Sequence, residues 1–237
     1  MKNSTKEIIN EINTYRDESK AAFLPRFFKT GKGEYGEGDQ FIGVVVPNLR
    51  IVAKKHFDAD FDTFRELLAS PYHEYRLTAL LALTYRYAKL KDHASRETCV
   101  NFYVSQVDAI NNWDLVDLSC YKILGHWLFD KDKQLLYDWA KENHLWKQRI
   151  AMISCMHFVK QGEFKDALAI ADLLQHHPHD LIHKAVGWIL REIGKEDEQL
   201  LIDYLTPRYK EMPRTMLRYA IERFEEGKRK TFLNSMI

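Results

Sequence analysis

The pair of side chains best suited to chemistry in this sequence is a tryptophan and an aspartate. Trp113 and Asp117 are four residues apart, so on a helix they lie on one face, one turn apart. Asn112 is a suitable N-cap residue, which places both in the first turns of that helix. Lys184 and Trp188 have the same spacing further along. A single Trp is more often a core residue, and a single Asp more often caps a helix or forms an ion pair, so the combination is more specific than its parts.

Asp117 also belongs to a column of charged residues in four similar segments. The segments are EYRLTALLAL from Glu74, LVDLSCYKIL from Leu115, KQRIAMISCM from Lys147 and IHKAVGWILR from Ile182. Their alignment places one charged residue of each in the same column: Arg76, Asp117, Arg149 and Lys184. Burying four unshared charges would be very costly, so we expect the column to face a solvent-filled groove. Ion pairs between helices explain the column equally well.

Three members of the column are basic, and a basic strip in a groove suits a polyanion. Such a groove would ordinarily reject a carboxylate, yet Asp117 occupies it. A carboxylate with an ordinary pKa near ~3.9 is ionised at neutral pH and can stabilise a positive charge that forms during a reaction. Indole faces also attract cations. The residues therefore indicate a site that faces a transient cation beside a bound polyanion.

The elements that position these residues are predicted to be repeated helices. The column members are separated by 41, 32 and 35 residues, and HEAT-type helical pairs repeat at about 40 residues. Only 10 Gly and 6 Pro are present, which favours long helices over many strands. We expect an all-α fold: a HEAT-like helical-repeat solenoid with a concave groove for a polyanion, forming a single domain over residues 1–237.

The helices can be located by their apolar spacing. Apolar residues follow helical spacing from Thr5 to Phe28, and the glycine-rich stretch from Thr30 to Asp39 predicts a loop. Pro47 fits the first turn of a helix over Asn48–Phe57. Gly194 is interpreted as a turn signal. Further helices are predicted over 60–69, 72–88, 94–108, 113–128, 132–142, 145–160, 163–175, 179–193, 197–206 and 212–225.

Composition narrows the class of protein. The net charge of +1 does not by itself indicate nucleic-acid binding. The three Cys have no zinc or disulfide spacing, which favours buried free thiols in a reducing cytoplasm. There is no signal peptide and no run near ~18 apolar residues, so we expect a cytoplasmic protein without a membrane span. The G-x-G-x-x-G of the loop follows a helix instead of a strand, which argues against a dinucleotide site.

Three segments resemble the AlkD-type DNA alkylation repair family of bacteria, which are HEAT-like repeat alkylpurine DNA glycosylases. They are NNWDLVD (Asn111 to Asp117), LWKQRIAM (Leu145 to Met152) and HKAVGWILRE (His183 to Glu192). The resemblance covers essentially the whole chain, in the same order. The stretch RFFKTGKGEYGEGDQFIGVVVPNLR is typical of a large branch of this family.

The resemblance implies roles for particular residues. The catalytic Asp of the family falls on Asp117, its two active-site Trp residues fall on Trp113 and Trp188, and its DNA-contacting Arg falls on Arg149. The glycine-rich loop is an insertion relative to the best-known members. Phe27 stands where some relatives have Tyr, so a hydrogen bond made by that hydroxyl would be lost.

The implied function is a DNA glycosylase that hydrolyses the N-glycosidic bond of cationic N3- or N7-alkylated purines in duplex DNA, the first step of base excision repair. Asp117 would stabilise the oxocarbenium-like sugar and orient a water, while Arg149 and Lys184 would hold phosphates. We expect a monomer with no metal and no cofactor. Two alternatives stay open: a non-catalytic HEAT-like protein that binds damaged or branched DNA, and a protein-interaction scaffold.

Overall fold

The structure is a computed structural model that describes residues 3–234, and within them the regular secondary structure is helical. The one extended pairing in this part is an isolated parallel bridge between Gln40 and Tyr72. The chain divides into two compact units, Met1–Ile123 and Leu124–Ile237, here called the N-terminal and C-terminal units. A single repeat domain over the whole chain stays a prediction.

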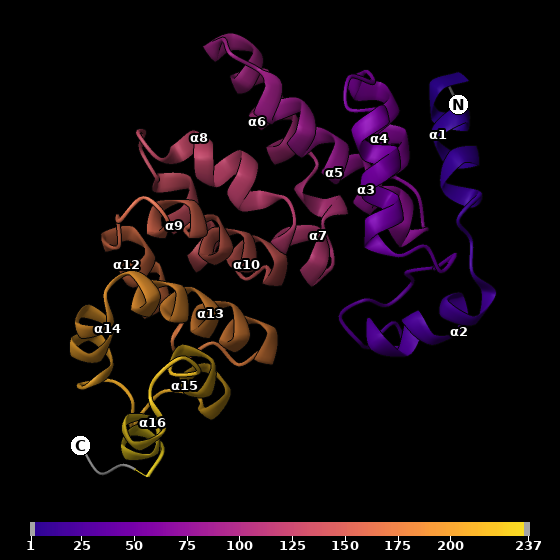
Figure 1. Cartoon of the computed structure of the whole chain (residues 1–237). Helices are drawn as coiled ribbons and strands as arrows, with labels where there is room; N and C mark the ends of the chain where they lie inside the picture. Colours follow the sequence, from indigo (N-terminus) through magenta and orange to yellow (C-terminus); the bar gives the residue numbers. More distant parts are fainter. Residues whose placement is uncertain (1–2, 235–237) are drawn as a thin grey trace. The chain divides into compact units, whose positions relative to one another are not determined.

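The N-terminal unit is organised around one long buried helix (Figure 1). Its helices are α1 (Asn3–Asn13), α2 (Glu18–Phe27), α3 (Val46–Lys55), α4 (Phe61–Leu68), α5 (His73–Lys89), α6 (His93–Ser105), a 3-10 turn (Val107–Ala109) and α7 (Trp113–Asp117). Helix α5 packs against α3, α4, α6 and α7, while α1 packs on α3 and α4. Because α5 is buried on nearly all sides, it forms the core on which α7 rests.

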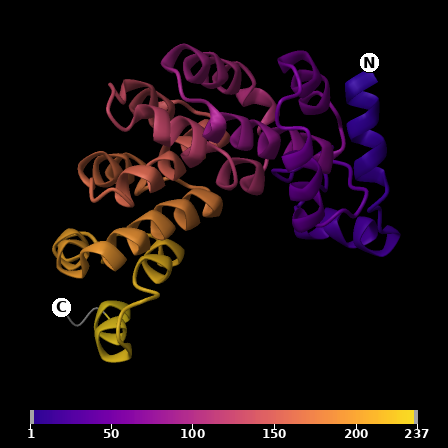
Figure 2. The ribbon, with the colours of Figure 1, turned by 45° about the horizontal axis from the view of Figure 1, so that its top comes forward.

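The C-terminal unit is organised around α13 in the same way (Figure 2). After a π-helix at the boundary (Tyr121–Gly125), its helices are α8 (His126–Leu128), α9 (Gln134–Lys141), α10 (Leu145–Ser154), α11 (Met156–Val159), α12 (Lys165–Leu174), α13 (Asp180–Glu196), α14 (Glu198–Leu205), α15 (Arg214–Ala220) and α16 (Glu226–Leu233). Helix α13 packs against α10, α11, α12, α14 and α15. A Cβ on Gly187 would lie 2.5 Å from the carbonyl oxygen of Met216, so this glycine permits the close approach of α13 and α15.

Most predicted helices are present, and the differences have local causes. The range from Thr5 to Phe28 holds two helices, because Asp17 accepts a hydrogen bond from the backbone N–H of Lys20 and so caps α2. The helix predicted over 113–128 is interrupted: α7 ends at Asp117, and after a turn the chain continues as the π-helix and α8 to Leu128. Ser119 donates its hydroxyl to the carbonyl oxygen of Leu115, and such bonds compete with regular helix.

One further prediction about the C-terminal unit is wrong, and one of its helices is missing from the prediction. Gly194 is not a turn; α13 continues through it to Glu196, and a Cβ there would lie 2.4 Å from Cδ2 of Leu201. The glycine therefore serves the packing of α14 on α13. Helix α16 was not predicted, because Phe232 is its one buried apolar residue and the apolar pattern is correspondingly weak. None of the helices within residues 3–234 has the length and apolar character needed to cross a membrane.

Candidate functional site

Helix α7 presents Trp113 and Asp117 on one face, as their spacing predicts. Asn112 caps the helix, and its side chain accepts a hydrogen bond of 2.9 Å from the backbone N–H of Trp113. Trp113 and Asp117 are partly exposed, whereas the three residues between them, 114–116, are buried. The short helix thus directs one face toward the surface and the other into the core of the N-terminal unit.

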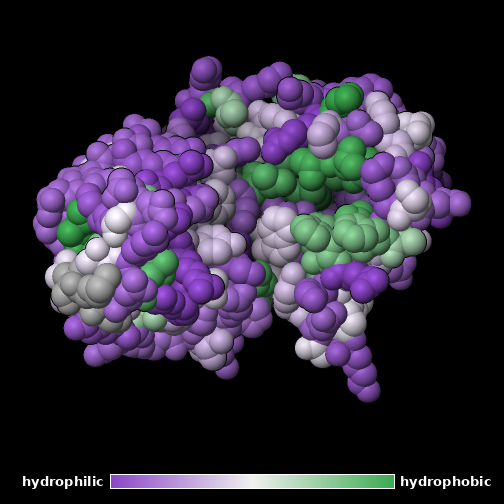
Figure 3. Space-filling view, turned by 60° about the horizontal axis from the view of Figure 1, so that its bottom comes forward, coloured by the Kyte–Doolittle hydropathy of each residue, from purple (hydrophilic) through white to green (hydrophobic). Residues whose placement is uncertain are grey.

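Trp113 belongs to an aromatic cluster that reaches the surface. Its ring stacks on Phe28 with centroids 5.4 Å apart and meets the edge of Phe27 at 5.9 Å. Phe27 and Phe23 are 52% and 61% exposed, although both are large and apolar. Figure 3 shows apolar side chains (green) gathered at the surface of this unit. The indole of Trp113 therefore lies at the border between a buried ring stack and an open aromatic surface.

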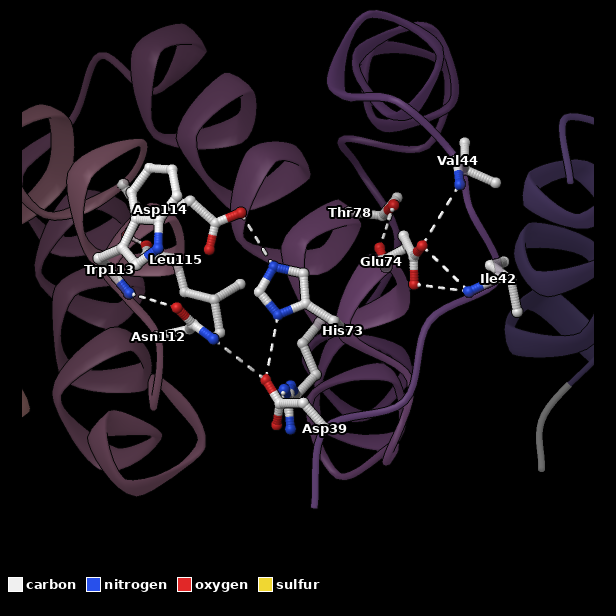
Figure 4. A network of polar contacts seen from close by, with 12 residues as sticks. Asp39, Ile42, Val44, His73, Glu74, Thr78, Asn112, Trp113, Asp114 and Leu115 are labelled. Atoms are coloured by element: carbon white, nitrogen blue, oxygen red, sulfur yellow. Dashed lines mark hydrogen bonds and ion pairs between the residues drawn. The ribbon is translucent and has the colours of Figure 1, made fainter. Parts of the chain in front are cut away.

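Beneath α7 lies a buried polar network (Figure 4). Nε2 of His73 lies 2.9 Å from Oδ2 of Asp114, and Nδ1 of the same ring lies 3.3 Å from Oδ2 of Asp39. The other oxygen of Asp39 lies 2.6 Å from Nη2 of Arg76. The amide of Asn112 also donates to Asp39, at 3.3 Å. Four charged side chains from the glycine-rich loop, α5 and α7 thus share one buried site.

Electrostatics assign the charges in this network. Burial alone would lower the pKa of His73, but the charge and hydrogen bond of Asp114, with the hydrogen bond to Asp39, raise it to about 9. Burial acts on Asp39 in the opposite sense, yet the hydrogen bond from His73 and the charge of Arg76 lower its pKa below the ordinary value. His73 is therefore a cation at neutral pH, and it lies between two carboxylates.

The glycine-rich loop carries Asp39 to this network. The loop is held by its own acids: Glu34 accepts from the backbone N–H of Gly31 at 2.7 Å, and Glu37 accepts from that of Gly33 at 2.8 Å. A Cβ on Gly36 would lie 2.6 Å from the carbonyl oxygen of Phe28, so a larger residue would push the loop away from α2. The two glutamates stabilise the loop backbone.

Helix α13 of the C-terminal unit places Lys184 and Trp188 together. Both side chains are partly exposed, whereas the residues between them, 185–187, are buried. Lys184 forms an ion pair of 2.7 Å with Asp180 one turn earlier. Arg149 of α10 is only 4% exposed and donates a hydrogen bond to the carbonyl oxygen of Leu181. Arg149 therefore supports the first turn of the helix that carries the other two.

The charged column does not behave uniformly, and its predicted exposure is wrong for two of its four members. Arg76 is 7% exposed and Arg149 is 4% exposed, so neither faces open solvent. The ion pair of Arg76 with Asp39 matches the ion-pair alternative, except that the partner lies on a loop and not on a helix. Asp117 and Lys184 are partly exposed, as expected.

Each unit brings part of the predicted site together. Trp113 and Asp117 lie on α7 of the N-terminal unit, and Arg149, Lys184 and Trp188 lie on α10 and α13 of the C-terminal unit. Their convergence on one DNA groove stays a prediction. Among the described residues, no group of three or more His, Cys, Asp and Glu side chains is arranged to hold a metal ion.

Sequence reasoning missed the residues that support α7. Asp114 lies inside the motif, but the spacing singles out Trp113 and Asp117, because these two share a helix face and Asp114 does not. His73 directly precedes the aligned segment from Glu74, and Asp39 ends the glycine-rich loop. Nothing in the linear order pairs these three residues, which lie 34 and 41 positions apart.

Together the helices define the class: an all-α helical-repeat protein, as predicted. The chain belongs to the DNA alkylation repair enzyme family, whose model matches residues 8–224. A solved structure described as a predicted DNA alkylation repair enzyme from Enterococcus faecalis is similar in fold, with a TM-score of 0.68 and 13% identity. That similarity covers 89% of this chain and 97% of the other. No curated protein matches the chain in sequence. Family membership gives the chain a role in DNA repair and DNA as its substrate.

Proposed function

We propose that this protein is a DNA glycosylase that removes cationic N3- and N7-alkylated purines from duplex DNA. One observation carries the proposal: in a member of the DNA alkylation repair family, two partly exposed residues, Asp117 and Trp113, lie one turn apart on the same helix. This pair suits a reaction in which positive charge moves from a base to a sugar.

The proposed reaction breaks the bond between C1′ of deoxyribose and the alkylated nitrogenous base. The electron pair of that bond goes to the base, which leaves as a neutral molecule, and the sugar becomes oxocarbenium-like. The Asp117 carboxylate stabilises this cation and orients a water whose oxygen attacks C1′, and the water's proton passes to the carboxylate or to solvent. Because the base is already cationic, the step needs no strong general acid.

The remaining site residues have binding roles in this proposal. The faces of Trp113 and Trp188 contact the sugar of the damaged nucleotide, and cation–π attraction contributes ~0.5–2 kcal/mol. Lys184 is the better exposed of the two phosphate contacts; Arg149, which also holds the carbonyl of Leu181, is the second. Such contacts position the duplex without reading its sequence.

The proposal also covers where and how the protein works. Cys99, Cys120 and Cys155 are all buried free thiols, which suits a reducing compartment such as the bacterial cytoplasm. We propose that the protein works there as a monomer and uses neither metal nor cofactor.

Release of free base from methylated duplex DNA tests the proposal. Wild type should release 3-methyladenine or 7-methylguanine. The Asp117→Asn variant should still bind the duplex, but its base release should fall below the detection limit. The matched control is Asp108→Asn, which removes an exposed carboxylate of the same unit and should release base at the wild-type rate. If wild type binds methylated duplex but releases nothing, the protein is a binding module and not a glycosylase. If it neither binds nor releases, the scaffold interpretation stands.

A further inference from the structure

We propose that Asp39, His73, Arg76 and Asp114, here called the α7 brace, act as positioning residues that hold Trp113 and Asp117 in place for the reaction. None of the four contacts substrate in this proposal. Their catalytic consequence rests on the proposed glycosylase function, but the positioning of α7 does not.

Helix α7 cannot hold its own position. It has five residues, and the backbone after it turns and then forms a π-helix over Tyr121–Gly125. Helix nucleation is unfavourable, and isolated helices shorter than about 12–15 residues are marginal in water. The direction of the Asp117 carboxylate therefore depends on contacts that α7 makes with the rest of the unit.

Asp114 provides an ion pair between α7 and α5. Its side chain is buried between the two partly exposed site residues and lies 2.9 Å from Nε2 of His73. Because Asp114 directly follows Trp113 and precedes Asp117 by three positions, fixing its carboxylate fixes the rotation of this one short turn. Rotation about the helix axis is the motion that would swing Asp117 away from C1′ of a bound nucleotide.

His73 contacts α7 by a second route. Its ring lies against Phe28 with centroids 4.8 Å apart and against Phe41 at 5.0 Å, and Phe28 stacks on Trp113. The same imidazole thus reaches α7 through an ion pair and through a ring stack. This double contact fixes the plane of the ring, and with it the direction of both N–H donors.

Asp39 closes the brace from the loop. It pairs with His73 and Arg76, and it accepts from the side-chain amides of Asn111 and Asn112 at 3.3 Å each. Asn112 is the residue that caps α7. The glycine-rich loop thereby gains a role: it carries a buried carboxylate to the residue that caps the helix.

The charges of the brace balance only when all four groups are present. Two carboxylates face two cations, and removal of one member of a buried pair is costly because it leaves an uncompensated charge. Asp39→Asn keeps the shape of the side chain and removes one negative charge. We expect α7 to loosen and the Asp117 carboxylate to lose its alignment; a misplacement of about 1 Å can cost on the order of 100-fold in rate.

The test compares Asp39→Asn with Glu37→Gln, two changes of the same kind on one loop. Glu37 is exposed, and its carboxylate accepts the backbone N–H of Gly33 in the same loop. Gln keeps an acceptor oxygen for this bond and removes only the charge, so Glu37→Gln controls for local effects. Three quantities are measured on the intact protein: hydrogen exchange of the free protein over residues 113–117, the single-turnover rate of 7-methylguanine release from a duplex, and Kd for that duplex.

For Asp39→Asn we expect exchange of α7 at least about 10-fold faster, release about 10–100-fold slower and Kd within about 3-fold of wild type. Glu37→Gln should match wild type in all three. If hydrogen exchange of α7 in Asp39→Asn equals that of wild type, the proposal that the α7 brace positions this helix is overturned, even if base release slows. Equal changes in rate and Kd would overturn its positioning role. If wild type releases no base, the glycosylase proposal fails. Hydrogen exchange over residues 113–117 still tests whether the α7 brace holds the helix in place.

A second variant keeps the test decisive if Asp39→Asn does not fold. Asn112→Ser keeps a capping oxygen for α7 but lacks the Nδ2 donor that reaches Asp39. It should accelerate exchange over residues 113–117 by a smaller factor of about 3-fold and slow release in parallel. Exchange equal to that of wild type would overturn the proposal.

Discussion

The His73→Gln variant should lack a pH-dependent contribution that His73 makes to the free energy of unfolding. The folded pKa of His73 is about 9 against an ordinary value of 6.5, so protonation favours the folded state. The sign follows from this direction: the contribution is fully present below pH 6.5 and is lost progressively as pH rises to about 9. A shift of this size corresponds to ~3 kcal/mol, at ~1.4 kcal/mol for each pKa unit.

Urea unfolding followed by circular dichroism measures this term. The free energy of unfolding of wild type minus that of His73→Gln should be larger by ~3 kcal/mol at pH 6 than at pH 10, with most of the change between pH 6.5 and 9. Taking the difference cancels the groups that titrate alike in both proteins. His93→Gln, an exposed change in the same unit, controls for loss of an imidazole. A difference that stays constant from pH 6 to 10 would refute the assignment of His73 as a cation in the fold.

Three other substitutions test separate parts of the structure. Glu74→Leu should lower the free energy of unfolding by ~1–3 kcal/mol in thermal melts at pH 7, because the buried carboxylate accepts the backbone N–H groups of residues 42–44 and leucine has no acceptor for them; an unchanged Tm would contradict this. Gly187→Val should cost ~1–3 kcal/mol in urea unfolding, since its side chain would collide with the carbonyl of Met216; wild-type stability would show that α15 moves aside freely. Lys184→Ala should weaken duplex binding for all sequences and reduce the slope of log Kd against log salt by about 1, and an unchanged slope would remove Lys184 from the phosphate contacts.

The helices were predictable because burying one apolar face imposes a period of 3.6 residues on the sequence. The bounds of helix α5, His73–Lys89, agree with the predicted 72–88 to one residue at each end. Its companion in the C-terminal unit, α13, was predicted to end before Gly194. The error arose because glycine serves two purposes, turning a chain and admitting a close neighbour, and only the fold shows that Leu201 occupies the space beside Gly194.

The candidate site was predictable only where its geometry is local. Asn112 fixes the start of α7, so the spacing of Trp113 and Asp117 correctly places both on one face. The exposure of Arg76 depended on a partner 37 positions away, Asp39, on a loop with no regular structure. A buried charge with a partner and an exposed charge look the same in a sequence pattern, because the pattern records residue types and not pairings.

The two acids of α7 show why a short helix in this place needs support from elsewhere. Asp114 is buried against the His73 cation, and Asp117, three positions later, is partly exposed. A carboxylate that must meet a cation only in the transition state has to be held in advance, since reorganisation during the reaction would cancel its benefit. Five residues of helix cannot supply that rigidity, so it has to come from residues outside the helix. Because burial selects the partners of Asp114, the proposed reactivity of Asp117 should depend on residues of α5 and the glycine-rich loop together with Asp114, the one brace residue within the motif.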